Sequence, residues 1–514
     1  MSVLRKLASQ TAIYGLSSII GRVAAWALTP IYTREMEVGE YGIFSDIYAF
    51  TTYFLVILTF GMETAFFRYS GDDKTETKPY AHSFMFVTGM ALIFLLLFGL
   101  GHESLAGLLG YGDRPKLVLM MVVITFFDVV VALPMAKFRF DERPIAFAVV
   151  SLVSIFFNIT LNLVFILGFK KTSAEWVFFA NLLASLLKVL ILLLLASPVS
   201  AYFKGMGSIG AKLAGVKLLP TSFKIDPVLL RSMAGFGLYI MVAGLLGMVN
   251  QNSDVNFLQR LWGDTPHAYG GHMYNGSEMV GIYSANKKLA VLILLVTQAF
   301  RYAAEPFFFR HAREGKSRAV FAKVFHYFAL ASLVVFLLVS SFSYEIVSFK
   351  VFGFQMVGEA YWGGLDVVPL LLFSFVIWGA YSNLTIWYKL TKQVRFGLMF
   401  SIVGVAIMVI LNLLLIPRYA YMGATWAMVV SYLVMTVLVY AIGQKYYRIP
   451  YRMVRILFYC LLFIGAYLIN AQMDGDVRGS AFWGKFFLSA AVIGGAVLME
   501  KFLPIRWEPA PTEA

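Results

Sequence analysis

The stretch VGEYGIFSDIYAFTTYFLVILTFGMETAFFR, residues 38–68, decides the fold because a related stretch occurs once more in the chain. Residues 277–310, SEMVGIYSANKKLAVLILLVTQAFRYAAEPFFFR, repeat it, with Gly281 matching Gly42 and Glu305 matching Glu63. Between the matching residues lies an apolar run of roughly 20 residues, long enough to cross a bilayer as a helix. Repeated membrane-spanning units of this kind are typical of transporters, whose binding sites lie between the repeats.

The composition indicates a polytopic membrane protein. Of the 514 residues, 60% are hydrophobic and 14% are charged, and the mean hydropathy is +0.77. A soluble protein of this size carries roughly a quarter charged residues. The single cysteine, Cys460, excludes disulfides within the chain and cysteine-metal clusters. The sequence contains no Walker motif, so we expect no ATP hydrolysis by this chain.

Apolar runs of spanning length predict about fourteen transmembrane helices. The predicted spans are residues 9–31, 41–62, 81–101, 117–136, 145–168, 175–197, 230–253, 279–301, 324–343, 366–387, 396–416, 421–442, 454–470 and 482–499.

The distribution of basic residues predicts the orientation. With a cytoplasmic N-terminus, most of the 42 Lys and Arg residues fall in inner loops, as the positive-inside rule requires. An odd number of spans would destroy this pattern, so we expect both termini in the cytoplasm. The net charge of +14 is then a feature of membrane topology, and we expect no nucleic-acid partner.

The repeat extends over six helices in each half. Asn162-Leu163 recurs as Asn412-Leu413, and Ala174 and Trp176 recur at the same offset in a later span. Because six is even, both halves enter the membrane from the same face, which predicts a parallel repeat with a pseudo-twofold axis near the membrane normal. We expect an N-terminal bundle (1–197), a cytoplasmic linker (198–227), a C-terminal bundle (228–442), and two further helices with a tail (443–514).

Ionisable side chains inside a span need a specific reason, because each costs at least about 2.5–3.5 kcal/mol at the helix centre. Arg22 lies near the centre of the first span, on a helix face that Tyr14 and other small or polar residues share. We expect this face to border water or substrate. A structural salt bridge from Arg22 to Asp46 or Asp254 is the alternative.

The eighth span contains Lys287 and Lys288 in its outer part, and Arg301 and Glu305 nearer its inner end. All three cations are candidates for binding an anionic substrate. Lysines near an interface can instead extend their ammonium groups toward the headgroups. Arg301 and Glu305 can instead form a structural pair.

The carboxylates inside the spans are candidates for proton or sodium coupling, or for fixed counter-ions. They are Asp46, Asp128, Asp254, Glu63 and Glu305. Most of the mid-span charges fall in the first, second, seventh and eighth spans. Asp128 and Lys188 are the clear exceptions.

Aromatic and amide side chains near these charges are candidates for sugar contacts, with packing or lipid contact as the alternative. They are Tyr14, Trp26, Tyr48, Tyr239, Asn250 and Tyr283. His267 and His272 share an outer loop, but a third ligand at suitable spacing is missing. We therefore expect no metal site, no catalytic residue and no cofactor beyond a coupling proton or sodium ion.

Several local motifs carry a family resemblance: Arg22 in the first span, GEYGIFS at residues 39–45, Asp254, and VGIYSA at residues 280–285. Together with the span count and repeat order, they make the chain similar to the Wzx-type oligosaccharide flippases. These are polysaccharide transporters of the multidrug/oligosaccharidyl-lipid/polysaccharide (MOP) superfamily. The resemblance implies that helices one, two, seven and eight line a central cavity.

The resemblance also implies a substrate, an oligosaccharide linked to undecaprenyl pyrophosphate. Its charges must cross a region where charge is poorly solvated, and cationic side chains in the cavity can replace the lost hydration. We expect a flippase of the bacterial inner membrane that acts beside the polymerase and chain-length proteins of its pathway and is not an enzyme. The alternatives are a cation-coupled multidrug extruder, a lipid II flippase and a membrane glycan polymerase. A polymerase needs a substantial outer loop to hold its catalytic groups, and the longest outer loop predicted here, residues 254–279, is modest for that purpose.

Overall fold

The computed structural model describes residues 20–21, 23–24, 26–70, 78–197, 225–311, 317–351, 353–391, 393, 395–473 and 479–503. For residues 299, 301–311, 317 and 351 it describes the backbone alone. Tyr14, Arg22, most of the predicted first span, most of the predicted linker and the tail after Leu503 therefore lie outside the described residues.

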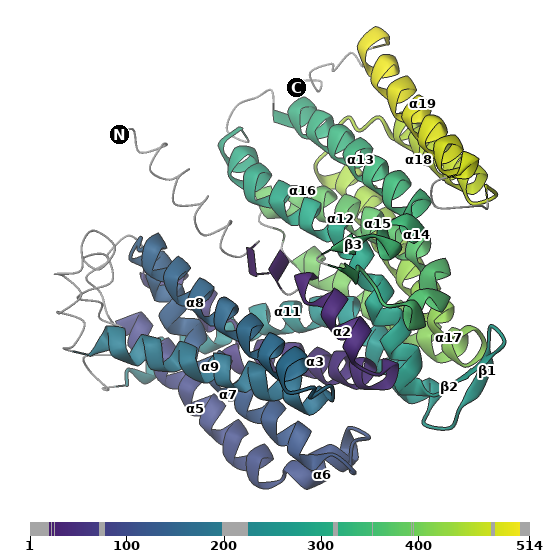
Figure 1. The fold of residues 1–514 in the computed structure, drawn as a ribbon. Helices are drawn as coiled ribbons and strands as arrows, with labels where there is room; N and C mark the ends of the chain where they lie inside the picture. The colour runs from purple at the N-terminus through teal and green to yellow at the C-terminus, as the bar shows by residue number, and fades with distance from the viewer. Residues whose placement is uncertain are drawn as a thin grey trace, which may run out of the picture. The chain divides into compact units, whose positions relative to one another are not determined.

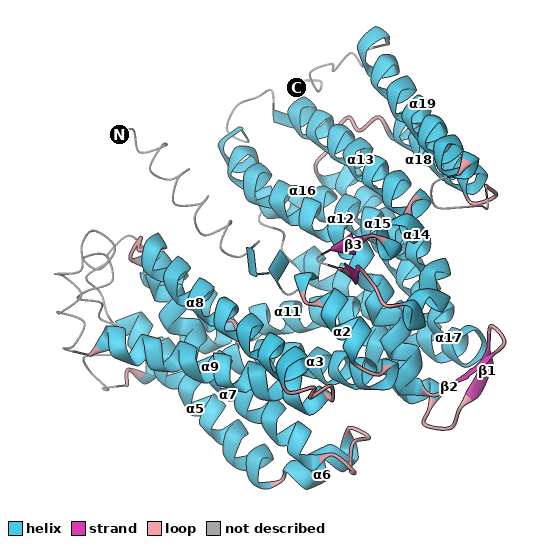
Figure 2. Ribbon diagram, viewed as in Figure 1, coloured by secondary structure: helices cyan, strands magenta, loops and turns pink. Residues whose placement is uncertain are grey.

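The protein is an all-α polytopic membrane protein. The described residues contain 12 helices that are long and apolar enough to cross a membrane. Each matches one predicted span, except that the 52-residue α17 (Arg395–Tyr446) covers two of them. α17 changes direction at Ala420, whose φ of 47° is not helical, so it consists of two spans in succession. Figure 2 shows helices throughout, with two short hairpins in the described chain.

The chain forms two compact units. The first contains residues 1–28 and 35–256, and the second contains residues 29–34 and 257–514. This division by packing differs from the division by repeat at two places. The seventh predicted span packs in the first unit, and the last three residues of the first predicted span pack in the second. Which bundle each helix belongs to by repeat remains a prediction.

Most of the described helices of the first unit are labelled in Figure 1. They are α3 (Val38–Thr59), α4 (Met62–Ser70), α5 (Lys78–Leu100), α6 (His102–Leu108), α7 (Pro115–Phe140), α8 (Pro144–Leu163) with its π-helical continuation η1 (Val164–Gly168), α9 (Ala174–Ala196), and α11 (Pro227–Trp262) as far as Asn256.

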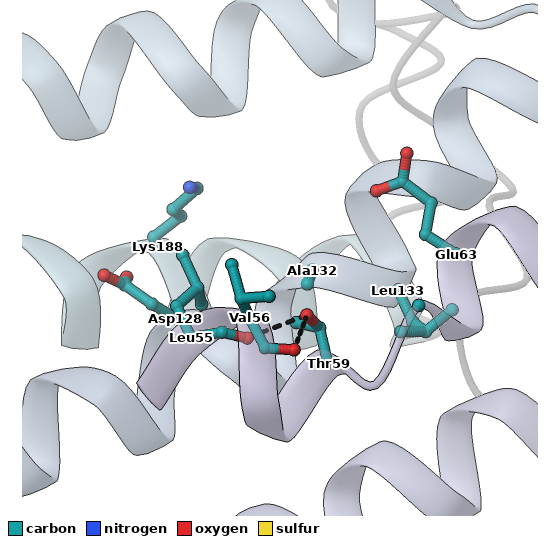
Figure 3. Close-up of a pocket in the computed structure, with 9 residues that line it drawn as sticks. Leu55, Val56, Thr59, Glu63, Asp128, Ala132, Leu133 and Lys188 are labelled. Atoms are coloured by element: carbon teal, nitrogen blue, oxygen red, sulfur yellow. Dashed lines mark hydrogen bonds between the residues drawn. The ribbon is translucent and has the colours of Figure 1, made fainter. Parts of the chain in front are cut away.

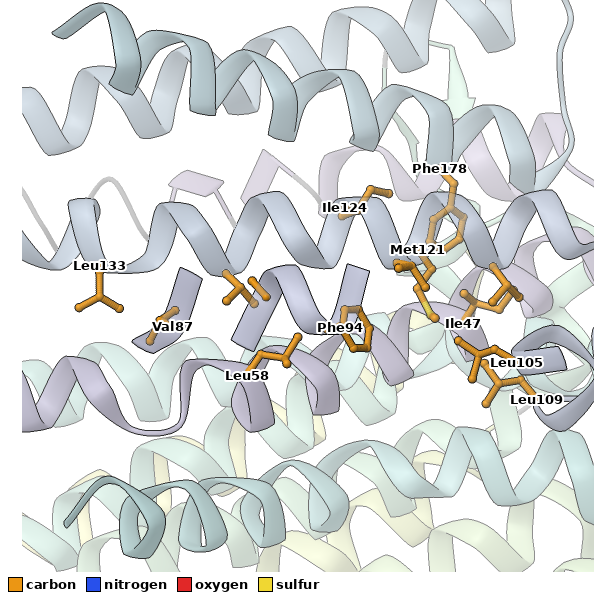
Figure 4. Packing of buried hydrophobic residues seen from close by; sticks show 14 of the residues in the cluster. Ile47, Leu58, Val87, Phe94, Leu105, Leu109, Met121, Ile124, Leu133 and Phe178 are labelled. Atoms are coloured by element: carbon orange, nitrogen blue, oxygen red, sulfur yellow. The ribbon is translucent and has the colours of Figure 1, made fainter. Parts of the chain in front are cut away.

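Helix α7 is the centre of the first unit, because it packs against α3, α5, α6 and α9. More than half of its most apolar window is buried, as expected for a helix that is apolar on all sides. Figure 4 shows Met121 and Ile124 of α7 within the apolar cluster that also contains Ile47, Phe94 and Phe178.

A break in the second predicted span gives α11 its docking position. α3 ends at Phe60 and Gly61, whose φ values are 52° and 66°, and the chain resumes as α4. A Cβ atom at Gly237 of α11 would lie 2.5 Å from the Phe60 carbonyl oxygen, and one at Gly61 would lie 2.7 Å from the Gly237 carbonyl oxygen. Only glycines allow two backbones to approach this closely.

This contact predicts a position-specific effect of alanine. Gly237→Ala should lower the free energy of unfolding by about 1–3 kcal/mol, because the added methyl group overlaps a backbone oxygen that cannot rotate away. Gly235→Ala, two residues earlier with no other atom within 4 Å of a Cβ, is the matched control and should be neutral or slightly stabilising. Thermal melting of the purified variants measures both, and equal melting temperatures would contradict the packing at Gly237.

The second unit contains the remaining described elements. They are α2 (Thr29–Glu35) as far as Arg34, β1 (His267–Tyr269), β2 (His272–Tyr274), α12 (Gly276–His311), α13 (Ser317–Ser341), α14 (Ser343–Ser348), β3 (Lys350–Val351), β4 (Phe354–Gln355), the 3-10 helix η3 (Glu359–Val367), α15 (Val368–Leu384), α16 (Ile386–Leu390), α17, α18 (Met453–Asn470) and α19 (Ser480–Phe502). Each strand pair forms an antiparallel hairpin, and α15 packs against α12, α13 and α17.

A polar network attaches the last two helices to α13. The Glu500 carboxylate of α19 accepts a hydrogen bond from Tyr459 of α18 at 2.6 Å and lies 2.9 Å from Nε2 of His326 in α13. The Arg455 guanidinium of α18 lies 3.1 Å from the same carboxylate and donates to the Met499 and Leu503 carbonyls at the end of α19. One carboxylate therefore connects three helices.

Removing this carboxylate should loosen the two appended helices. Glu500→Ala leaves the largely buried Arg455 without its counter-charge, and breaking a buried pair typically costs about 3–5 kcal/mol. We expect a clearly lower melting temperature, with part of the loss recovered in the Arg455→Ala/Glu500→Ala double variant. If Arg455→Ala lowered the stability of the Glu500→Ala variant by as much as it lowers that of the unmodified protein, the two side chains would not be coupled.

Candidate functional site

A polar pocket lies within the first unit, where α3, α4, α7 and α9 meet (Figure 3). Its volume is about 380 Å³. The lining is apolar along the ends of α3 and α7 and charged where three ionisable side chains enter it. The lining residues are Leu55, Val56, Thr59, Gly61, Glu63, Asp128, Ala132, Leu133 and Lys188.

Asp128 of α7 and Lys188 of α9 lie on the same side of this pocket (Figure 3). Ser185, one helical turn before Lys188, donates a hydrogen bond to the Asp128 carboxylate at 2.9 Å. Residues three apart share a helix face, so α9 presents both a hydroxyl and an ammonium to one carboxylate. Lys188 is thus the cation nearest in the pocket lining to the carboxylate that Ser185 holds.

Glu63 of α4 provides the second carboxylate of the pocket. It forms an ion pair at 2.8 Å with Arg139, in the last turn of α7. The Arg139 guanidinium also lies 5.8 Å from the centres of the Phe67 and Phe147 rings. The structure thus brings Asp128 and Glu63, two predicted site residues, into one pocket.

Asp46, another predicted carboxylate, lies in a separate buried cluster of the first unit. It accepts hydrogen bonds from Tyr111 at 2.7 Å and from the Asn256 amide of α11 at 2.6 Å. Tyr53 donates to the same Asn256 at 2.8 Å. Asp254, on the preceding turn of α11, is also buried. Asp46 therefore links α3 to α11.

Glu40, in the motif GEYGIFS, has a structural role at the end of the first unit where α3 and α9 begin. Its carboxylate pairs with Arg114 at 2.6 Å and accepts a hydrogen bond from the backbone N–H of Ala174, where α9 begins. A carboxylate is favoured at a helix N-terminus. Burial lowers the pKa of Arg114, but the hydrogen bond and charge of Glu40, together with the charges of Asp113 and Glu175, more than offset it and raise the pKa.

The predicted cations of the eighth span lie in α12 of the second unit. Lys287 and Lys288 are half-buried, and the Lys287 ammonium lies 5.5 Å from the centre of the Tyr283 ring. Tyr283 itself is fully buried, so in this structure its ring packs within the protein. Arg301 and Glu305 continue the same helix, and their backbones alone are described.

The other predicted sugar-contact residues differ in their exposure. Tyr48 is 46% exposed and Tyr239 is 38% exposed, so both side chains are accessible from outside the protein. Trp26 is half-buried. Asn250 is buried and donates a hydrogen bond to the Leu246 carbonyl of its own helix. Of these four, Tyr48 and Tyr239 present the most accessible rings.

Lys188 lines the pocket, and Ser185 and Arg139 contact its two carboxylates. None of these three residues was among the predicted site residues. Lys188 had a sequence signal, because a lysine in the middle of a span requires a partner. Arg139 falls in a basic inner loop of the predicted topology, and Ser185 is an uncharged residue within a span, so neither is distinctive in the sequence. Their roles depend on contacts between helices that sequence spacing does not specify.

The amino-acid sequence matches a known protein family. A family model described as "Polysaccharide biosynthesis protein" matches residues 7–312, more than half of the chain. The chain belongs to the polysaccharide biosynthesis protein family. A search of curated proteins found no match.

Solved structures similar to this family member are transporters of the MOP superfamily. The lipid II flippase MurJ, in an inward closed conformation, is 12% identical with a TM-score of 0.68 over 95% of this chain and 99% of MurJ. A multidrug resistance MATE family transporter of the MOP superfamily, in its inward-facing conformation, is 12% identical with a TM-score of 0.61 over 85% of this chain and 94% of the transporter. The predicted resemblance to the MOP superfamily is confirmed.

The Asp128–Lys188 arrangement predicts a coupled effect on stability. Lys188→Met should lower the free energy of unfolding by about 1–3 kcal/mol, because the Asp128 carboxylate loses its counter-charge in a poorly hydrated pocket. The Asp128→Asn/Lys188→Met double variant should be more stable than Lys188→Met alone. Thermal melting of the single and double variants measures this coupling.

A matched control is Lys170→Met, since Lys170 forms an exposed ion pair with Glu35 and should change stability by less than about 1 kcal/mol. Additive effects of Asp128→Asn and Lys188→Met would show that the two side chains do not interact.

Proposed function

We propose that this family member is a flippase that moves a polyprenyl-pyrophosphate-linked oligosaccharide from the cytoplasmic to the outer leaflet of a bacterial inner membrane. The observation that carries the proposal is the match to the polysaccharide biosynthesis family on a chain with the MOP transporter fold. A protein that serves polysaccharide synthesis and has a transporter fold has an obvious cargo, the lipid-linked glycan.

The chemistry of the cargo accounts for the cations of α12. A pyrophosphate group carries at least two negative charges, and charge-assisted hydrogen bonds from Lys287, Lys288 and Arg301 would offset its lost hydration. Arg22 of the first span would add a planar guanidinium suited to phosphate oxygens. The prenyl chain would stay in the lipid while the sugars pass through the protein, with Tyr48 and Tyr239 as accessible rings for stacking.

The carboxylates supply a route for coupling transport to an ion gradient. Asp128 and Glu63 line the pocket of the first unit. A proton or sodium ion that binds there, or at Asp46, Asp254 or Glu305, would drive alternating access without another cofactor. In this proposal the protein is a transporter and not an enzyme, both termini are cytoplasmic, and the glycan passes to a polymerase and chain-length proteins outside.

A lipid II flippase is the second candidate, because the similarity to MurJ extends over nearly the whole of both chains. The two functions share the polyprenyl pyrophosphate and differ in the attached sugar. A multidrug extruder is a third candidate from the MATE similarity. Its cargo is a drug molecule without a polyprenyl chain.

Translocation by purified protein in vesicles tests these alternatives. The substrate is an undecaprenyl-pyrophosphate-linked oligosaccharide, and a membrane-impermeant glycosidase reports its arrival on the outer leaflet. We expect the glycan to cross with the protein present and not in protein-free vesicles. Efflux of a cationic dye with no glycan movement would support the multidrug extruder instead, and movement of lipid II alone would support the lipid II flippase.

The cations should contribute strongly to the rate. The Arg22→Ala/Lys287→Ala/Lys288→Ala variant should translocate at least about tenfold more slowly, since losing one or two charge-assisted hydrogen bonds costs about 1.5–3 kcal/mol each. Lys170→Ala/Lys171→Ala, which removes two positive charges between α8 and α9, is the control and should translocate normally. A normally folded triple variant with the full rate would disprove the assignment of these cations.

A further inference from the structure

The pocket of the first unit is larger and more varied in its lining than an ion requires. Its volume of about 380 Å³ falls within the range of roughly 300–1,000 Å³ that is typical of small-ligand sites. Much of the lining is apolar and comes from Leu55, Val56, Ala132 and Leu133. A ligand that fits this pocket therefore has an apolar surface as well as polar groups.

The polar groups of the pocket have hydrogen-bonding capacity for such a ligand. Asp128 accepts a hydrogen bond from Ser185, and an ionised carboxylate has about four acceptor positions. The Lys188 ammonium, on the same side of the pocket in Figure 3, has three donors. Thr59 donates to carbonyls of its own helix, which leaves its oxygen able to accept. The pocket thus offers both donors and acceptors.

The charges at the pocket balance each other. Among the described side chains, the lining contains the carboxylates of Asp128 and Glu63. The cations beside them are Lys188 and Arg139, the ion-pair partner of Glu63. A pyrophosphate would meet two carboxylates here, whereas hydroxyl groups can donate to a carboxylate and accept from an ammonium in charge-assisted hydrogen bonds. The electrostatics therefore favour a neutral ligand rich in hydroxyl groups.

Further polar side chains continue from the pocket toward the beginnings of α3 and α9. Asn181 lies seven residues before Lys188, so the two share a face of α9, and the Asn181 amide oxygen accepts a hydrogen bond from Asn158 of α8 at 2.7 Å. Tyr48, which is 46% exposed, lies seven residues before Leu55 on one face of α3. Because α3 and α9 begin at the same end of the unit, this amide and this ring lie beyond the same end of the pocket.

We propose that this pocket binds one neutral sugar ring of the lipid-linked oligosaccharide. Asp128 and Lys188 bind its hydroxyl groups, and the apolar part of the lining contacts its C–H face. The next sugar of the chain then lies toward Asn181 and Tyr48, and the pyrophosphate binds elsewhere. This inference rests on the proposed function, which supplies the sugar.

Calorimetric titration of the purified full-length protein measures this binding. The probe is the free oligosaccharide, released by mild acid from the lipid-linked glycan of the cells that make the protein, in a detergent without a sugar headgroup. We expect the parent protein to bind it, Asp128→Asn to weaken the affinity at least about tenfold, and saturating inorganic pyrophosphate to change the affinity by less than about twofold. One pH and one sodium concentration throughout keep ion binding constant.

The substitution Ala132→Phe separates a sugar from an ion. Its ring fills the apolar part of the pocket, so it should weaken oligosaccharide binding at least about tenfold while leaving room for a proton or a sodium ion at Asp128. Ala491→Phe, on the exposed surface of α19, is the matched control and should bind as the parent protein does. Melting temperatures show whether each variant is folded.

Unchanged oligosaccharide binding in folded Ala132→Phe or folded Asp128→Asn overturns the proposal, and so does displacement of the oligosaccharide by inorganic pyrophosphate. A parent protein that moves the glycan in vesicles but does not bind the free oligosaccharide also overturns it. Binding in the pocket by a protein that moves no glycan would instead disprove the proposed function and leave the sugar site standing.

Discussion

Polar groups in a bilayer interior have no water to bind, so each must find its partner within the protein, and this constraint organises the whole chain. Asp46 takes hydrogen bonds from Tyr111 and Asn256, and through them α3 is attached to α11. Glu500 does the same for α13, α18 and α19. In both cases a carboxylate specifies which helices pack together. An apolar side chain in lipid gains little free energy by contacting one apolar helix rather than another.

The sequence predicts the spans well and their partners poorly. Length and hydropathy are local properties, so α5, α7 and α9 begin and end close to their predicted limits. Packing is not local. The repeat places the seventh span in the second half, and nothing in its own composition shows that Gly237 fits a break at Phe60–Gly61. Lys188 likewise signals that it needs a partner, but only the arrangement of α7 and α9 shows that Asp128 and Ser185 lie beside it.

These observations give the charges of the chain two kinds of role. Glu40, Asp46 and Glu500 hold helices together through hydrogen bonds and ion pairs. Asp128, Glu63 and Lys188 face a pocket of about 380 Å³ with room for water or an ion. In the proposed flippase, the first kind keeps each moving body rigid, and the second kind can change partner or protonation as the bodies move. Lys287 and Lys288, half-buried on α12, are the cations that we propose bind the anionic cargo.

The central claim is that this chain carries a lipid-linked glycan from one leaflet to the other, and the most direct measurement follows that lipid in living cells. The protein is depleted from cells that make it, and an impermeant lectin then reports how much lipid-linked oligosaccharide faces outward. The account predicts that the intact lipid-linked glycan accumulates with its sugars on the cytoplasmic face. An unchanged outward-facing pool after complete depletion would contradict it.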